Sequence, residues 1–411
     1  MKWFVLLIAL LIAVVSKAQT QNIWTKKTSF EGNKRSRAVA FSIDNYGYVG
    51  TGEDTADMTH NDLWRYDPLL DSWTQMSSLP GSTRRNAIGT TLNGKGYLGL
   101  GADSSVSGSG IILDDWWEYD PLINQWSQKT SYPGGYNIYN QTGTAGVYFS
   151  TAFAIDSVVY VCGGKMGPNF YGTDLWKYNP TTDIWTRLAD FPGGDRHQLS
   201  SFAIEGNGFV GMGIDHDLYR KDWWKYDPIT DSWTEVAELP GVERGAASTF
   251  VLGQHGFVVF GSDGGYKDEL WEYDPFANSW QIRSNFPADG RKNAIAFAIA
   301  DTGYAGLGTS SSGKRKSFYA YTPFWPLGIY NEEISINTFP NPASNFINIT
   351  VPNSLIGQSL QIFSLDGKKA YSELITSTSR TVNLVEFARG TYILIIVDQS
   401  GTLISEKINV L

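Results

Sequence analysis

The sequence has a single cysteine, Cys162, and only four histidines among its 411 residues. One cysteine excludes an intramolecular disulfide, and no His/Cys pair stands at the spacing of zinc ligands. Cys162 lies in the run VVYVCGG, which is typical of a buried strand. We therefore expect this thiol to be a small apolar core residue, and we predict no metal and no other cofactor.

Positive charge is scarce as well. Lysine and arginine number 32 against 41 aspartates and glutamates, which gives a net charge of −9. The basic cluster Lys314-Arg315-Lys316 is short, and we interpret it as a solvated loop. Because binding of nucleic acid calls for a basic stripe or a Lys/Arg-rich helix, the sequence favours no nucleic-acid partner.

Long hydrophobic runs occur only at the N-terminus. Lys2 precedes the apolar run Trp3–Val15, and Ser16 and Ala18 place small residues at the −3 and −1 positions of a cleavage site. The run is shorter than the roughly 20 residues with which a helix crosses a bilayer. Residues 1–18 are therefore predicted to be a cleavable secretory signal peptide, with the mature N-terminus at Gln19 and no membrane span elsewhere.

The dominant positive feature is a repeated motif, an aromatic-rich strand that ends in Tyr-Asp-Pro or Tyr-Asn-Pro and is followed by Trp. Its copies are DLWRYDPLLDSW (62–73), DWWEYDPLINQW (115–126), DLWKYNPTTDIW (174–185), DWWKYDPITDSW (222–233) and ELWEYDPFANSW (269–280). The spacing inside each copy is fixed, whereas the interval between copies varies around about 50 residues. This combination is typical of β-propeller blades, in which length changes fall in loops.

A second repeat lies upstream of each copy. Each unit has an aliphatic residue, then an aromatic residue five positions later and a glycine four positions after that; the glycines are Gly52, Gly101, Gly164, Gly213, Gly261 and Gly308. We expect them at positions of positive φ or close backbone approach. The sixth unit degrades to SFYAYTP (317–323) and lacks its Trp, which Trp24 near the N-terminus can supply. The pattern predicts a six-bladed propeller over residues 19–325 whose last blade is completed by the N-terminal strand.

These strand types resemble the Kelch repeat over roughly residues 22–325. The resemblance implies an all-β fold with a six-bladed Kelch-type propeller. The tyrosine and the tryptophan of each unit are then expected to pack between blades, where a large buried side chain contributes about 1.5–3 kcal/mol.

The C-terminal part has a different pattern. After a predicted linker at 326–333, residues 334–411 contain seven short alternating runs, which are typical of a small Ig-like antiparallel β-sandwich. The strings FPNPASNFINI, SLQIFSLDGKKA, FARGTYILIIV and SGTLISEKINVL resemble the type A C-terminal sorting domain of the type IX (Por) secretion system of Bacteroidetes-type bacteria. The resemblance implies an outer-membrane secretion translocon as partner, and passage through the periplasm and the outer membrane to the cell surface or the medium. An ordinary accessory Ig-like module is the alternative.

Candidate ligand-binding residues follow from the Kelch resemblance, which places the residues just before each inner strand at one face of the central channel. Arginine stands near this position in five units, as Arg37, Arg85, Arg196, Arg244 and Arg291. Converging guanidinium groups can hold a carboxylate or a polyol, whereas the alternative is that each arginine caps its own blade by bonding carbonyls. The third unit carries an insertion at 134–149 instead, with Tyr136 and Tyr139 as candidate sugar-stacking residues or as part of a solvated loop.

Enzymatic functions make demands that can be compared with the sequence. Kelch-type copper radical oxidases need a tyrosine–cysteine cross-link and converging histidine ligands, which no motif here brings together. Sialic acid mutarotases are also six-bladed Kelch proteins, and for such an activity Glu243, beside Arg244, is the candidate proton shuttle. We therefore predict an exported, non-catalytic binding protein for a glycan or an extracellular protein, with a sugar-acid mutarotase as the alternative.

Overall fold

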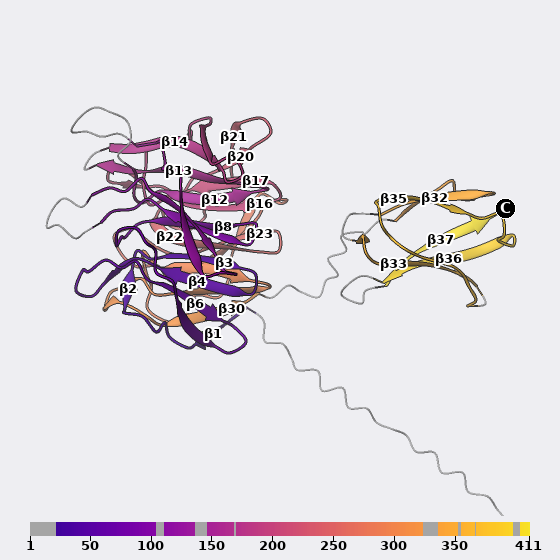
Figure 1. The fold of residues 1–411 in the computed structure, drawn as a ribbon, viewed down its shortest axis with the longest axis horizontal. Helices are drawn as coiled ribbons and strands as arrows, with labels where there is room; N and C mark the ends of the chain where they lie inside the picture. The colour runs from indigo at the N-terminus through magenta and orange to yellow at the C-terminus, as the bar shows by residue number, and fades with distance from the viewer. Residues whose placement is uncertain are drawn as a thin grey trace, which may run out of the picture. The chain divides into compact units, whose positions relative to one another are not determined.

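The computed structural model describes residues 22–103, 111–135, 146–167, 170–323, 336–351, 355–365, 367–397 and 403–411. The chain divides into two units, Met1–Phe324 and Trp325–Leu411. Within the described ranges the regular elements are β-strands, and none of those residues lies in an α-helix (Figure 1).

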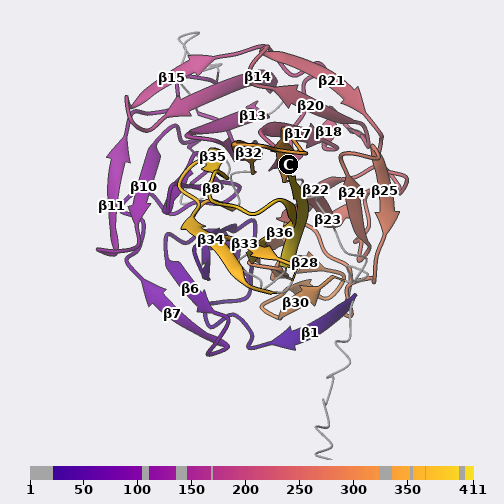
Figure 2. The ribbon, with the colours of Figure 1, turned by 90° about the vertical axis from the view of Figure 1, so that its right-hand side faces the viewer.

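The repeats of the first unit form six four-stranded antiparallel sheets. The innermost strands are β3 (Val39–Ile43), β8 (Ile88–Leu92), β12 (Thr151–Ile155), β16 (Ser200–Ile204), β22 (Gly245–Leu252) and β26 (Ile295–Ile299). The second strands are β4 (Tyr46–Gly50), β9 (Lys95–Gly99), β13 (Val158–Gly167), β17 (Asn207–Gly211), β23 (His255–Ser262) and β27 (Thr302–Gly306). The innermost strands contact one another in cyclic order, so that the sheets stand in a ring (Figure 2). Residues of all six innermost strands line a central channel.

The repeated Tyr-Asp-Pro and Trp segments form the outer half of each sheet. The third strands are β6 (Leu63–Asp67), β10 (Trp116–Asp120), β14 (Phe170–Asn179), β20 (Trp223–Asp227), β24 (Leu270–Asp274) and β30 (Phe318–Thr322). The outermost strands are β7 (Ser72–Met76), β11 (Gln125–Lys129), β15 (Ile184–Arg187), β21 (Ser232–Val236), β25 (Ser279–Ile282) and, beside β30, β1 (Ile23–Lys27). The pairing of β1 with β30 runs from Ile23 opposite Thr322 to Lys27 opposite Phe318.

The repeated aromatic residues pack and stitch the sheets together. Each motif tyrosine is at most 1% exposed, and its hydroxyl donates to an Asp or Asn side chain of the outer hairpin or, for Tyr321, of Asn22, at 2.7–2.8 Å. Each motif tryptophan donates its indole N–H to a backbone carbonyl that follows the outermost strand of the neighbouring sheet, at 2.8–3.1 Å. The predicted blade-packing role of these residues is confirmed. Cys162 is likewise fully buried, and burial raises the pKa of its thiol.

The six repeated glycines have a shared backbone role. All have φ between 80° and 110°, and each donates its N–H to a carbonyl of the next sheet at 2.8–3.0 Å. A Cβ built on Gly101 would lie 2.7 Å from the carbonyl oxygen of Arg85. The expectation of positive φ and close backbone approach is confirmed, and both requirements exclude other residues.

The second unit contains a three-stranded and a four-stranded sheet. The first has β31 (Asn337–Phe339), β32 (Phe346–Thr350) and β35 (Ser379–Asn383), and the second has β34 (Lys369–Leu374), β33 (Ser359–Ser364), β36 (Gly390–Val397) and β37 (Leu403–Val410). Alternate residues of these strands, such as Ile347, Leu360 and Leu394, form a hydrophobic core of this unit's own.

Candidate functional site

One face of the ring is organised by the residues that lead into the innermost strands. Six equivalent residues have left-handed backbone, with φ between 48° and 59°; they are Arg37, Asn86, Phe149, Gln198, Ala246 and Asn293. Each donates its backbone N–H to the carbonyl of its counterpart in the neighbouring sheet at 2.8–3.1 Å, so that the six bonds close a ring. These residues line a hollow of about 130 Å³, which we call the mouth. Left-handed backbone is uncommon for large side chains such as Arg37 and Phe149, and such conformations gather at functional sites.

The structure corrects the expectation for three of the predicted ligand-binding arginines. Arg196, Arg244 and Arg291 are at most 2% exposed, because their guanidinium groups are enclosed within the sheets. They form one equivalent set with Arg35 and Arg84, which are buried to the same extent. The alternative interpretation, in which each arginine caps its own blade, therefore describes this set. Arg37 and Arg85 belong to different positions, two residues and one residue further along the chain.

The contacts of the buried set explain why it repeats. In every case Nη1 donates to the carbonyl of the residue 16 positions later, at 2.8–3.3 Å. Four of the five also pair with the acid that opens the repeated motif, namely Asp62, Asp115, Asp222 and Glu269, and Arg291 donates to the Ser317 hydroxyl instead. The acid at the first position of each motif was the sequence signal for these pairs, and sequence reasoning missed it.

Arg37 and Arg85 do converge, and they meet on Glu53, which the sequence analysis did not single out. Arg37 Nη1 lies 3.0 Å from Glu53 Oε1, and Arg85 binds the other carboxylate oxygen. Lys314 Nζ lies 3.1 Å from Glu53 Oε1. Glu53 is almost fully buried, whereas Arg37 and Arg85 are 29% and 32% exposed. Burial favours a higher pKa for Glu53, but the hydrogen bonds from Arg85 and Lys314 and the charge of Arg37 outweigh it and lower the pKa.

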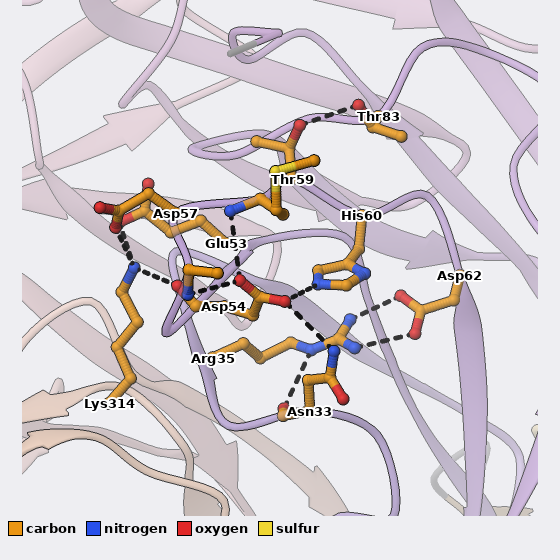
Figure 3. A network of polar contacts seen from close by, with 12 residues as sticks. Asn33, Arg35, Glu53, Asp54, Asp57, Thr59, His60, Asp62, Thr83 and Lys314 are labelled. Carbon is orange, nitrogen blue, oxygen red and sulfur yellow. Dashed lines mark hydrogen bonds and ion pairs between the residues drawn. The ribbon is translucent and has the colours of Figure 1, made fainter. Parts of the chain in front are cut away.

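A second layer of contacts fixes the loop that carries Glu53 (Figure 3). Glu53 and Asp54 form β5 (Glu53–Asp54), which pairs with β2 (Arg35–Ser36). The Asp54 carboxylate accepts the N–H groups of Ala56 and Met58 at 2.9 and 3.2 Å and bonds His60 at 3.1 Å. Lys314, on β29 (Gly313–Lys314), reaches the Asp54 carbonyl at 2.5 Å and Asp57 at 2.8 Å. Lys314 thus ties the sheet of β26 to that of β3 beside the mouth.

Next to Arg37, a series of aromatic rings in contact with one another begins with Phe149 at the mouth. The Arg37 guanidinium lies 5.7 Å from the centre of the Phe149 ring, which lies 5.6 Å from the His197 ring. His197 stacks on Tyr171 with ring centres 5.0 Å apart, and Lys165 lies 5.3 Å from the Tyr171 ring. Burial, and then the nearby charge of Lys165, lower the pKa of His197 to about 4, so its imidazole is neutral at pH 7. The series offers flat rings next to hydrogen-bonding groups, a combination suited to sugars.

The remaining predicted residues are not brought into this cluster. Tyr136 and Tyr139 lie outside the described residues. Glu243 is exposed, and its neighbour Arg244 is turned into the sheet, where it binds Glu269. The carboxylate that does lie between two arginines is Glu53.

One group of side chains within the described ranges has the spacing of metal ligands. The ligand atoms of Asp195, Asp215 and His216 lie within 4.8 Å of one another. Asp215 is already engaged by Arg220 and by His216 Nδ1, the latter at 2.8 Å. A guanidinium in contact with the same carboxylate disfavours a further cation there.

Comparisons with known proteins find matches in both units. Residues 337–410 match the family of the secretion system C-terminal sorting domain, and residues 147–192 match the Kelch motif. A solved protein titled "Structure of YjhT" has a TM-score of 0.59 at 12% identity, over 80% of this chain and 97% of that one. At this identity the likeness shows the fold alone. No curated protein matches the chain in sequence.

These findings confirm the all-β propeller and the sorting domain that the repeats and the C-terminal strings predicted. In the parts of the chain that the structure describes, no helix has the length and apolar character of a membrane span. Together the matches show a propeller that contains a Kelch motif at residues 147–192, followed by a C-terminal sorting domain of the type IX secretion system at 337–410, which indicates secretion to the cell surface or beyond.

Proposed function

We propose that this exported propeller is a non-catalytic binding protein whose ligand, a glycan or an extracellular protein, meets the mouth. The observation that carries the proposal is the convergence of Arg37 and Arg85 on Glu53 beside the partly buried Phe149 ring. Glu53 orients both guanidinium groups, and each keeps about a third of its side chain open to solvent. Guanidinium N–H groups that remain free suit carboxylates and hydroxyls, while the ring suits the apolar face of a sugar.

The protonation behaviour of the same residues argues against acid–base catalysis by a mutarotase. A proton carrier works best with a pKa near the operating pH. The pKa of Glu53 is instead lowered by its three cationic neighbours, so Glu53 stays ionised and is a weak base. The pKa of His197 is also too low, at about 4. Glu243 is exposed, and the side chain of the adjacent Arg244 is buried in the sheet, where it pairs with Glu269 instead.

A glycan array with the mature chain tests the proposal. We expect binding to be lost in Arg85→Ala and in Phe149→Ala, because the first removes a mouth donor and the second removes the stacking surface. Arg187→Ala is the matched control, since Arg187 is 57% exposed on the outermost strand β15 and pairs only with Asp190 among the described residues. Tyr139→Ala tests the insertion in the same way. Unchanged binding by folded Arg85→Ala and Phe149→Ala variants would move the site elsewhere.

The mutarotase alternative has its own readout. NMR exchange spectroscopy of sialic acid reports interconversion of its anomers directly. A rate above that of buffer, which disappears in Glu53→Gln, would replace the binding proposal by an enzymatic one.

A further inference from the structure

Charge around the mouth is unevenly distributed. Three sets of six equivalent positions lie around the channel. The first set consists of the six residues with left-handed backbone that line the mouth. The second set precedes it in the chain and consists of Ser36, Arg85, Tyr148, His197, Gly245 and Lys292. The third set pairs with the second and consists of Glu53, Ala102, Lys165, Ile214, Ser262 and Thr309. These positions hold four cations, Arg37, Arg85, Lys165 and Lys292, and one carboxylate, in a chain whose net charge is −9.

The four cations follow one another around the ring. Lys292, Arg37, Arg85 and Lys165 belong in that order to the consecutive sheets of β26, β3, β8 and β12. Hydrogen bonds, ion pairs and, between Arg85 and Tyr148, a charge interaction link these positions. Asn293, next to Lys292, accepts the N–H of Arg37 at 2.9 Å, and Arg37 and Arg85 share Glu53. Tyr148, close enough to Arg85 for its charge to act on the tyrosine pKa, exchanges backbone hydrogen bonds with Lys165 at 2.7 and 3.0 Å.

The two ends of this arc are lysines without a carboxylate partner among the described residues. Lys165 lies over the Tyr171 ring at 5.3 Å, and Lys292 lies over the Tyr266 ring at 5.4 Å. Both are partly exposed. By contrast, the sheets of β16 and β22 complete the circle with His197, Gln198, Ile214, Gly245, Ala246 and Ser262, which carry no formal charge at pH 7.

We infer that the mouth binds an acidic polysaccharide, a chain with a carboxylate or sulfate on successive sugars that follows the arc from Lys292 to Lys165. The inference rests on the proposed binding function and names its ligand class. A lone acid group would need one cation pair, whereas four cations on four consecutive sheets match a row of negative charges. Phe149 and Tyr171 stand at the Lys165 end, where sugar rings can stack.

Acidic residues next to the arc favour a sugar chain over a nucleic acid as the ligand. One residue beyond the third set the chain has Asp54, Asp103, Asp215 and Asp263. DNA carries one negative charge per about 1.7 Å of duplex, so a duplex that overhangs the arc meets Asp103, Asp215 and Asp263, which are partly or fully exposed, whereas Asp54 is buried. The more widely spaced charges of an acidic polysaccharide can stay on the arc.

The test is a titration of the mature protein with oligogalacturonates of one, four and eight units. Neutral malto-oligosaccharides of the same lengths, a chondroitin sulfate octasaccharide and a short DNA duplex serve as comparison probes. We expect affinity to rise with the number of acidic units and to fall with added salt, because ion release scales with the charges neutralised. Neutral chains should bind at least roughly tenfold more weakly, and the carboxylated and sulfated probes tell which acid is preferred.

Charge-removal variants locate the binding. Lys165→Gln and Lys292→Gln should each weaken oligogalacturonate binding several-fold and flatten its salt dependence. Lys26→Gln, an exposed lysine on the outermost strand β1, is the matched control and should change neither. Failure of every acidic probe to bind, equal binding of neutral chains, or equal binding of DNA would overturn the inference. If a neutral glycan binds and only Arg85→Ala and Phe149→Ala weaken it, the acidic class is wrong and the binding function stands. If those two variants also bind normally, both proposals fall.

Discussion

Arg84 and Arg85 are adjacent in the sequence but differ in burial and in the contacts of their side chains. Arg84 is fully buried and donates to Asp115 at 2.5 and 2.7 Å and to the Leu100 carbonyl at 3.2 Å. Arg85 is about a third exposed and reaches Glu53 at the mouth. The sequence alone does not distinguish Arg84 from Arg85. Only the directions of their side chains show that Arg84 lies within the sheet and that Arg85 lies at the mouth, where we propose that the ligand binds.

This contrast supplies the first prediction. Arg84→Met should lower the free energy of unfolding by about 3–5 kcal/mol, because it leaves Asp115 without its buried partner. Arg85→Met removes the same charge from the next residue and should cost less than about 1 kcal/mol, since its partner retains Arg37 and Lys314. Urea denaturation followed by tryptophan fluorescence measures both values. Equal losses in the two variants would contradict the assignment of separate roles.

His197 predicts a pH dependence. Its pKa is about 4 in the folded protein and near 6.5 in an unfolded chain. Between these values the unfolded state binds more protons, so this residue makes stability rise with pH. Lowering the pH from 7 to 4 should therefore reduce the free energy of unfolding of the wild type by up to about 3 kcal/mol through His197 alone. The His197→Phe variant keeps the ring stack and should not show this loss.

The measurement is the difference in unfolding free energy between wild type and variant at each pH, in which the other titrating groups cancel. His216 provides an opposite control, because its hydrogen bond to Asp215 raises its pKa. Its contribution is present at low pH and lost as the pH rises through the folded pKa, so His216→Gln should deviate with the reverse sign. A flat difference curve for His197→Phe would show that His197 is not protected from protonation.

At the scale of elements, the strands were predictable because each depends on a local pattern. The fixed distance between Tyr, Pro and Trp sets a hairpin, and in four of the six sheets the second strand ends just before the glycine at positive φ, so a single sequence reveals both. The pairing of the buried arginines was not predicted, because their partners lie 25 to 31 residues away in the chain. The role of Glu53 was missed for a similar reason. Its cations come from three sheets, and Lys314 is 261 residues from it in the chain.

The N-terminal strand β1 carries the third prediction. It gives β30 its outer partner, and Trp24 donates to the Ser284 carbonyl at 2.9 Å. A chain that starts at residue 31 leaves β30 as an open edge and removes the carbonyl that Trp73 binds. We expect a markedly lower thermal midpoint and aggregation, measured by near-UV circular dichroism and light scattering. Deletion of residues 331–411 is the control and should leave the midpoint of the propeller nearly unchanged, whereas equal effects of the two deletions would refute the closing role of β1.

At the scale of the whole molecule, we assign ligand binding to the propeller and export to the second unit. The propeller has its core between the sheets, and we propose that its ligand binds at the mouth. The second unit has a separate core, built from residues such as Ile347, Ile362 and Ile396, and it matches the sorting domain over residues 337–410. Because each core is complete within its own unit, export and ligand binding can be separated by truncation.

Truncation at residue 330 therefore makes the last prediction. In the native bacterium the shortened protein should be processed at Gln19, which mass spectrometry can establish, and should then stay in the periplasm, because the segment that the outer-membrane machinery recognises is gone. Protection from protease added to intact cells measures this retention. The retained propeller should keep its ligand affinity, so misfolding is not the cause of the block. Fusion of residues 331–411 to a periplasmic passenger should carry that passenger to the surface, and surface exposure of the truncated propeller would show that residues 331–411 are dispensable for export.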